Sequence, residues 1–186
     1  AVAVSQGLAR LLDAPPGGDL TGDRQTDILW QHPVSSRLVW WAMNGTVRTS
    51  GGYTTPDSPN GDPLWRVRGT ADFDGDGRLD LLLHRGQTGE VFLWLMNGTT
   101  VASGTLTTPP NQDPAWRASA TADFDADGRP DILWRHEATG ELRAWLMNAA
   151  TRRADVALAP SALPDLNWRL AGAGDFNQDG KADLLW

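Results

Sequence analysis

Short apolar runs, separated by Gly, Pro and Asp residues, recur along this chain. One complete unit reads LDLLLHR from Leu79, GEVFLWLMNG from Gly89, TTVASGTLTTPP from Thr99 and WRASATADF from Trp116. The runs are rich in Leu, aromatic and β-branched residues, and no helical period continues across their Gly and Pro boundaries. The pattern predicts four short antiparallel strands per unit and an all-β fold.

Two of the units contain a strong hairpin signal. The tetrapeptide MNGT occurs at 43–46 and again at 96–99, in each case between two strand-like runs. Asn-Gly between alternating apolar segments favours a tight β-hairpin turn. The third copy reads MNAA, with Ala149 in place of the glycine, which weakens the signal there.

The unit is repeated at a nearly fixed interval. Asp19, Asp72, Asp123 and Asp175 mark equivalent positions, separated by 53, 51 and 52 residues. A unit of about 50 residues with four antiparallel strands has the size of one propeller blade. We therefore expect a single repeat domain, residues 1–186, built as a β-propeller-like array of about three full blades plus a partial one. The expected blades are 1–60, which is divergent, then 61–111, 112–163 and the partial blade 164–186.

The last blade is expected to contain only its first two strands, which would leave an open sheet edge. Three arrangements would resolve this. The N-terminal stretch AVAVSQGLARLL could complete the last blade, another copy of the chain could complete it by self-association, or the chain could be a piece of a longer protein.

Each unit carries an aspartate-rich loop. In residues 72–80, DFDGDGRLD, Asp72, Asp74 and Asp76 stand at positions one, three and five, and Asp80 closes the loop at position nine. Gly77 permits a left-handed turn, and the backbone carbonyl of Arg78 adds a further oxygen. Ca²⁺ prefers about six to eight hard oxygen ligands in a flexible cage. The spacing therefore predicts a calcium loop.

The same loop occurs three more times. The copy at 123–131 is intact, the copy at 175–183 replaces one carboxylate by an amide, and the copy at 19–27 has Thr21 at position three and Arg24 in place of the glycine. We expect the copy at 175–183 still to bind, because Asn177 keeps a carbonyl oxygen. In the copy at 19–27 we expect a strained left-handed turn at Arg24 and weak or absent binding. The candidate ligands in these three loops are Asp123, Asp125, Asp127, Arg129 and Asp131, then Asp175, Asn177, Asp179, Lys181 and Asp183, and finally Asp19, Asp23 and Asp27.

The alternative interpretation is that the loops are turns capped by their own Asp side chains, without metal. The charge distribution argues against it. Fourteen of the 23 acidic residues lie in the four loops, and the formal net charge is -7. Carboxylates gathered in this way repel one another unless cations neutralise them, so we favour metal binding.

The tryptophans follow the same period. Nine of the ten fall into three equivalent sets. A residue that recurs in every blade is more simply explained by packing between neighbouring blades than by ligand binding. Trp40 alone stands outside the pattern, and although packing is favoured there too, it is the one candidate for ligand binding. The three sets are Trp65, Trp116 and Trp168, then Trp41, Trp94 and Trp145, and then Trp30, Trp134 and Trp186.

The composition of the chain argues against several classes of protein and of binding site. No apolar run approaches the roughly 20 residues of a membrane span, and the opening residues lack the features of a signal peptide, so any export signal has been removed or lies outside this sequence. The chain has no Cys, which excludes disulfides and thiolate metal sites. A pI near 4.8 disfavours nucleic acid as a partner.

The loops DFDGDGRLD, DFDADGRPD and DFNQDGKAD, with following strands such as DILW, resemble the FG-GAP/VCBS repeats of bacterial secreted proteins. These repeats are similar to the calcium-binding blades of integrin α-subunit propellers. The resemblance implies a calcium-stabilised β-propeller, usually extracellular, that serves adhesion or ligand binding beside a catalytic domain.

We therefore expect a non-catalytic, Ca²⁺-binding module of a secreted protein that recognises a glycan or a protein. The candidate recognition loops are His32–Arg37, His84–Glu90 and Arg135–Glu141. The alternatives are a structural spacer or an accessory propeller attached to a secreted hydrolase. A metal-dependent hydrolase is disfavoured because the three His residues are scattered and no Ser-His-Asp or His-rich set can be assembled.

Overall fold

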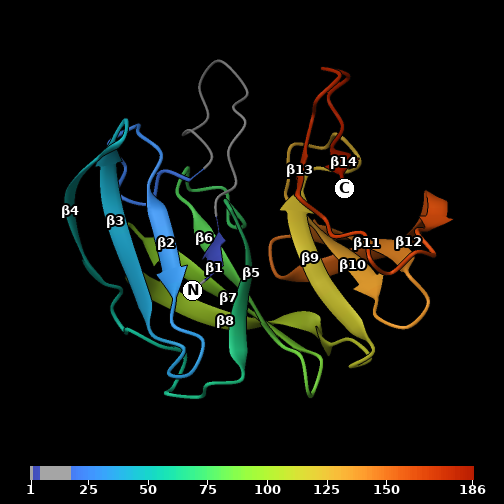
Figure 1. Ribbon diagram of the computed structural model, residues 1–186, viewed down its shortest axis with the longest axis horizontal. Coiled ribbons are helices and arrows are strands. Elements are labelled where there is room, and N and C mark those ends of the chain that lie inside the picture. The colour runs from blue at the N-terminus through green and yellow to red at the C-terminus, as the bar shows by residue number, and fades with distance from the viewer. Residues whose placement is uncertain (1, 5–17) are drawn as a thin grey trace.

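The computed structural model describes residues 2–4 and 18–186 (Figure 1). All regular elements in these residues are β-strands, and none of the described segments is a helix able to cross a membrane. The strands are β1 (Val2–Val4), β2 (Ile28–Gln31), β3 (Leu38–Asn44), β4 (Val47–Tyr53), β5 (Trp65–Ala71), β6 (Asp80–Arg85), β7 (Glu90–Asn97), β8 (Thr100–Asn111), β9 (Trp116–Ala122), β10 (Asp131–His136), β11 (Glu141–Asn148), β12 (Thr151–Ala162), β13 (Gly172–Gly174) and β14 (Asp183–Leu185).

The strands form sequential antiparallel sheets. The first sheet has the order β1-β2-β3-β4, the second β5-β6-β7-β8 and the third β9-β10-β11-β12, and β13 pairs with β14. A single parallel bridge between Thr108 and Thr151 joins the second and third sheets through β8 and β12. A similar bridge from Thr55 to Thr100 links the first sheet to the second.

The sheets stand around a common centre. β1 contacts β5, β5 contacts β9, and β9 contacts β13, so the first strands of successive sheets are neighbours. The remaining strands extend outward and give a curved array (Figure 1). This arrangement confirms the predicted all-β class, and its radial order is that of propeller blades.

The N-terminal strand lies in the first sheet. β1 pairs antiparallel with β2, with Val4 opposite Leu29. It therefore takes the place next to β2 that β5 and β9 take in the following sheets, where it covers an otherwise open edge. Of the three arrangements considered for the last blade, its completion by this stretch is wrong for residues 2–4, and the rest of AVAVSQGLARLL lies outside the described residues.

Two apolar cores lie between the sheets. One joins Leu29 and Leu38 of the first sheet to Leu81, Leu83 and Trp94 of the second. Because β6 is enclosed on both faces, its residues 81–83 form a continuous apolar run rather than an alternating one.

The second core joins the second sheet to the third. Leu82, Val91 and Leu93 of the second sheet pack against a group from the third that includes Trp134 and Trp145. Both indoles are fully buried, and their ring centroids lie 4.8 Å apart. These residues thus fill the space between neighbouring sheets.

The packing role predicted for the repeated tryptophans is confirmed for Trp94, Trp116, Trp134 and Trp145, which are all buried. It is wrong for Trp168, which is 52% exposed, because it leads into β13, where the described strands form only half a blade. The packing interpretation also holds for Trp40, which lies against the first core, and its Nε1–H donates to the carbonyl oxygen of Tyr53 at 3.2 Å.

The predicted hairpins are confirmed, with one shift of register. Asn44 pairs with Val47 and Asn97 with Thr100, so the two-residue loops are Gly-Thr rather than Asn-Gly. The first loop residue has φ of 59° at Gly45, and Ala149 adopts the same left-handed region at 50°.

Candidate metal centres

The four aspartate-rich loops occupy equivalent places in the array. Residues 72–80 connect β5 to β6, residues 123–131 connect β9 to β10, and residues 175–183 connect β13 to β14. Residues 19–27 lead into β2. Because each loop enters the second strand of its sheet, all four lie at corresponding strand ends.

The first aspartate of each loop organises the turn. In the second loop, Asp72 Oδ1 accepts the N–H groups of Gly75 and Asp76 at 2.8 and 3.1 Å, and Oδ2 accepts that of Gly77 at 2.8 Å. Asp19 collects three backbone N–H groups in the same way. The turn shape therefore arises from side-chain capping, even in the degenerate loop.

The last aspartate anchors the loop to the sheet. Asp80 is fully buried, and its Oδ2 accepts the N–H of Phe73 while its Oδ1 accepts the N–H of Met96, both at 2.8 Å. Asp131 repeats this arrangement with Phe124 and Met147. One carboxylate thus connects the loop to the third strand of the same sheet.

Burial sets the electrostatics of these anchors. It raises the pKa of Asp80 and of Asp131 to about 6, because a carboxylate removed from water is disfavoured in its charged form. The backbone hydrogen bonds oppose this shift, whereas the neighbouring loop carboxylates add to it. A cation placed beside the anchors would favour their charged form.

Among the described residues, two loops gather three carboxylates. Asp72, Asp74 and Asp80 each offer an oxygen, and these atoms lie within 4.8 Å of one another. The corresponding triad in the third sheet is Asp123, Asp125 and Asp131. The donors are all hard oxygens, so both triads are consistent with Ca²⁺ sites.

One atom in the third loop supports this fit. Asp125 Oδ1 is buried and has no hydrogen-bond partner among the described residues. An unpaired buried carboxylate oxygen is costly, and coordination by a cation would satisfy it. The residues present therefore fit a Ca²⁺ ion.

The fifth loop position has a different role. Asp76 Oδ1 accepts the N–H of Arg78, and Asp127 Oδ1 accepts that of Arg129, both at 2.9 Å. Neither residue belongs to a triad. These carboxylates shape the turn, and coordination by them or by the Arg78, Arg129 and Lys181 carbonyls stays a prediction.

The other two loops do not form a carboxylate triad in the described structure. Thr21 stands at position three of the first loop, and its Oγ1 is buried without a described partner. Asn177 of the fourth loop donates from Nδ2 to Asp179 Oδ2 at 3.3 Å. The expected left-handed strain at Arg24 is confirmed by its φ of 67°.

Two features of the loops were not predicted. Position four is also left-handed, with φ of 80° at Gly75 and 63° at both Ala126 and Gln178. The glycines Gly22 and Gly75 at that position were an available signal.

The second feature is an arginine that comes from another strand. Arg153 of β12 donates from Nη2 to Asp125 Oδ2 at 2.8 Å and to Asp127 Oδ2 at 2.5 Å. The hydrogen bond to Asp125 and the surrounding carboxylates raise the pKa of Arg153. The loop sequence itself gives no sign of this contact.

The histidines lie away from the triads. His32 and His136 each use Nδ1 to accept two N–H groups of their own turns. The sequence predicted that His84 begins an exposed recognition loop. This prediction is wrong for His84, because its side chain is fully buried in β6. Burial, with the charges of Arg68 and Arg117, lowers its pKa to about 3.

One comparison with known protein families agrees with this geometry. The FG-GAP-like repeat matches three overlapping segments, residues 19–83, 72–134 and 123–186. A search of curated proteins gives no significant match. Repeats of this kind are typically non-catalytic. Since the three matches together span residues 19–186, the chain belongs to the FG-GAP-like repeat family.

Proposed function

We propose that this chain is a non-catalytic, calcium-stabilised binding or adhesion module of a secreted protein. The observation that carries the proposal is the pair of equivalent triads, Asp72, Asp74 and Asp80 in one sheet and Asp123, Asp125 and Asp131 in the next. A site repeated in successive sheets suits a structural role, because a catalytic site is usually single.

The buried anchors explain how the metal would act. Asp80 and Asp131 already bind backbone N–H groups of their third strands. A Ca²⁺ ion held by either triad would supply positive charge and connect the exposed loop to that anchor. Because the ion binds only the folded arrangement, it would stabilise the fold by mass action.

The recognition surface that we propose lies on the first sheet. A cavity of about 550 Å³ there is lined by Trp30, His32, Arg37, Val39 and Tyr53, among others, and it includes part of the predicted loop His32–Arg37. The Arg37 guanidinium lies 3.9 Å from the Tyr53 ring centroid. Aromatic faces beside polar groups suit a sugar ring or an extended peptide.

The expected calcium affinity of the loops also leads us to propose that the protein is secreted. Calcium loops in extracellular modules typically bind in the range of about 10⁻⁴ to 10⁻³ M. Calcium is reliably present at such concentrations outside cells. We therefore expect half-saturation well above the micromolar range, and saturation below about one micromolar would contradict export.

The test of calcium stabilisation is calorimetry of the whole chain in EDTA, in millimolar Mg²⁺ and in millimolar Ca²⁺. We expect a melting temperature several degrees higher in Ca²⁺ than in the other two buffers. Asp74→Asn and Asp125→Asn should each remove part of the shift, whereas Asp57→Asn, outside the loops, should leave it intact. Superimposed curves in EDTA and Ca²⁺ would refute the proposal.

The test of recognition is a glycan array and a peptide library probed in Ca²⁺. Binding that Tyr53→Ala abolishes and Leu106→Ala preserves would support the cavity on the first sheet. Folded, calcium-loaded protein that binds no ligand would favour the structural spacer instead, or an accessory propeller attached to a secreted hydrolase.

A further inference from the structure

Two successive interfaces between sheets use the same repeat position differently. Between the first and second sheets, Gln31 of β2 bonds directly to β5. Its Nε2 donates to the carbonyl oxygen of Trp65 at 3.0 Å, and its Oε1 accepts the N–H of Val67 at 3.1 Å. Between the second and third sheets the equivalent residue is His84 of β6. His84 is fully buried, and neither ring nitrogen has a hydrogen-bond partner among the described residues.

An arginine at the same two interfaces shows the same difference. Arg66 of β5 donates from Nη1 to Ser36 Oγ at 2.9 Å and from Nη2 to the carbonyl oxygen of Pro33 at 2.7 Å. The counterpart of Arg66 is Arg117 of β9, and the counterpart of Ser36 is Gly89, which has no hydroxyl group. Arg117 Nη1 is buried without a partner in the described structure. The second interface thus lacks the side-chain oxygen that accepts this N–H group in the first.

The unpartnered groups lie close together between the second and third sheets. The His84 ring stands edge-on to Trp134 of β10, with the ring centroids 5.2 Å apart. A Cβ added at Gly86 would collide with the Arg117 guanidinium, which therefore lies against the turn that follows β6. Burial, together with the charges of Arg68 and Arg117, lowers the pKa of His84, so both guanidinium groups lie within electrostatic reach of the ring.

Arg68 of β5 adds a second unpartnered guanidinium. Its Nε is buried and has no hydrogen-bond partner among residues 2–4 and 18–186. Burial lowers the pKa of Arg68, and the nearby charge of Arg117 lowers it further. Arg68 has no counterpart of the same charge in the third sheet, where Ser119 stands at the equivalent position. Positive charge is therefore concentrated at this one interface.

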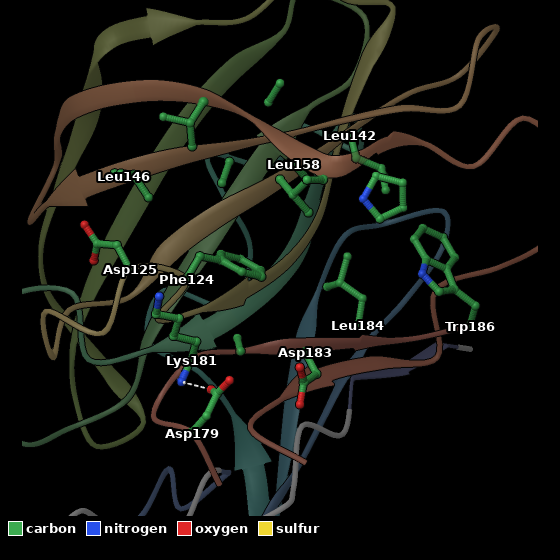
Figure 2. Close-up of a pocket in the computed structure, with 16 residues that line it drawn as sticks. Phe124, Asp125, Leu142, Leu146, Leu158, Asp179, Lys181, Asp183, Leu184 and Trp186 are labelled. Carbon is green, nitrogen blue, oxygen red and sulfur yellow. Dashed lines mark hydrogen bonds between the residues drawn. The ribbon is translucent and has the colours of Figure 1, made fainter. Parts of the chain in front are cut away.

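The described residues do not balance that charge. Glu137 Oε1 accepts from Arg117 Nε at 2.6 Å, but no described carboxylate forms an ion pair with Arg66 or Arg68. The carboxylates of the aspartate-rich loops, such as Asp125 (Figure 2), lie at the other end of the strands. Three guanidinium groups therefore share one carboxylate. A water molecule at this place would satisfy the N–H groups but leave the charge, whereas an anion would do both.

We propose that His84, Arg68 and Arg117 form a buried binding site for a small monovalent anion of the halide type, such as chloride. Arg68 Nε–H, Arg117 Nη1–H and a ring N–H of His84 donate to the ion. Hydrogen bonds from charged donors are among the strongest in proteins. A halide accepts N–H groups from several directions, and its single charge costs less to remove from water than the double charge of sulfate or phosphate.

The bound anion would connect the second sheet to the third. His84 and Arg68 belong to β6 and β5, whereas Arg117 belongs to β9. In the preceding interface, Gln31 and Ser36 make the corresponding connection with direct hydrogen bonds. The site is therefore a structural link between sheets, separate from the candidate metal centres.

The direct test is anomalous diffraction from crystals of the whole chain soaked in sodium bromide. Bromide replaces chloride, and its anomalous signal distinguishes it from water. We expect a bromide peak within hydrogen-bond distance of Arg68 Nε, Arg117 Nη1 and a ring nitrogen of His84. An ordered water without anomalous signal at that place, or bromide bound only at the protein surface, would overturn the proposal.

Urea denaturation measures the site in solution. The whole chain is unfolded in excess Ca²⁺ in sodium chloride and in sodium methanesulfonate of equal ionic strength, because methanesulfonate is also monovalent but is much larger. We expect a higher urea midpoint in chloride, with a gain that rises with chloride concentration as for a ligand that binds only the folded state. Equal midpoints in the two salts would contradict the site.

Variants assign the chloride effect to particular residues. Arg68→Met removes one donor, and His84→Gln introduces the residue that bonds directly to the next sheet at Gln31. We expect both variants to lose most of the chloride-dependent gain. Arg48→Met, in β4 and outside the cluster, is the matched control and should keep it. Retention of the full gain in both Arg68→Met and His84→Gln would place the anion elsewhere and refute the site.

Discussion

The second and third sheets have the same strand order and the same carboxylate triad, but they balance the triad charge differently. In the third sheet, Arg153 reaches over from β12 and binds Asp125 and Asp127. The corresponding residue of the second sheet is Ala102, which carries no charge. The loop sequence thus defines where a cation can be held, and a distant strand decides whether a guanidinium competes for the place.

The two sheets also differ in how they connect to the next one. Arg135 of β10 donates to the carbonyl oxygen of Trp168 at 2.8 Å, and Gln31 of β2 donates to that of Trp65 at 3.0 Å. His84 holds the same position in β6, yet neither ring nitrogen has a partner among the described residues. At this repeated position, a side-chain hydrogen bond therefore links the first and third sheets to the next segment along the chain, whereas the described structure has no such bond from the second sheet.

The largest expected effect is a loss of folding stability that is the same for the second and the third sheet. Asp80→Ala and Asp131→Ala each leave two N–H groups without an acceptor, both buried at Asp80 and one buried and one partly buried at Asp131, which costs about 3 kcal/mol in the free energy of unfolding. Asp183→Ala should cost only about 1 kcal/mol, because the two N–H groups that its Oδ2 accepts, those of Phe176 and Asn177, are both exposed to water. Urea denaturation in Ca²⁺ measures all three variants. An Asp183→Ala cost equal to that of Asp131→Ala would contradict the hydrogen-bond account.

The buried His84 should make stability depend on pH through the second sheet but not through the third. The pKa of His84 is lowered to about 3, so below pH 6.5 the unfolded chain binds a proton that the folded chain does not. Stability is therefore lost as pH falls, by about 2 kcal/mol at pH 5 relative to neutral pH. In His84→Gln, which carries the residue found at Gln31, this part of the acid sensitivity should vanish. Parallel stability profiles of the two proteins between pH 7 and 5 would disprove it.

Much of the fold could be predicted because its signals are local and repeated. The apolar runs before and after each Asp loop gave the four strands per unit, and the fixed spacing of Asp72 and Asp123 gave the blade repeat. The recurrence of Trp94 and Trp145 identified them as packing residues. Each inference needed only short segments or a period, and a one-dimensional pattern contains both.

The remaining features depend on contacts between distant segments. The placement of β1 beside β2 requires knowing which strand edge is open. The contact of Arg153 with Asp125 spans 28 residues, and the burial of His84 depends on Trp134, which lies in another sheet with its ring centroid 5.2 Å away. A loop motif contains none of this information.

A reciprocal exchange sharpens the comparison of the two triads. Arg153→Ala removes the competing guanidinium and should tighten Ca²⁺ binding at Asp123–Asp131 by about two- to fivefold. Ala102→Arg should weaken binding at Asp72–Asp80 by a similar factor. Titration calorimetry at low and high salt measures both, and screening should shrink both effects at high salt. Unchanged affinities at low salt in both variants would show that Arg153 does not compete with the metal.

The smallest expected effect concerns backbone strain at position four of the same two loops. Ala126 has φ of 63°, in the left-handed region, whereas the second loop has Gly75 at 80°. Ala126→Gly should therefore raise stability by about 0.5–1 kcal/mol, since the strain removed exceeds the added entropy of the unfolded chain. Gly75→Ala should lower stability by a similar amount through φ alone, because a Cβ there meets no atom within 4 Å. Denaturation in EDTA isolates this backbone term from metal binding, and shifts of the same sign in the two variants would refute it.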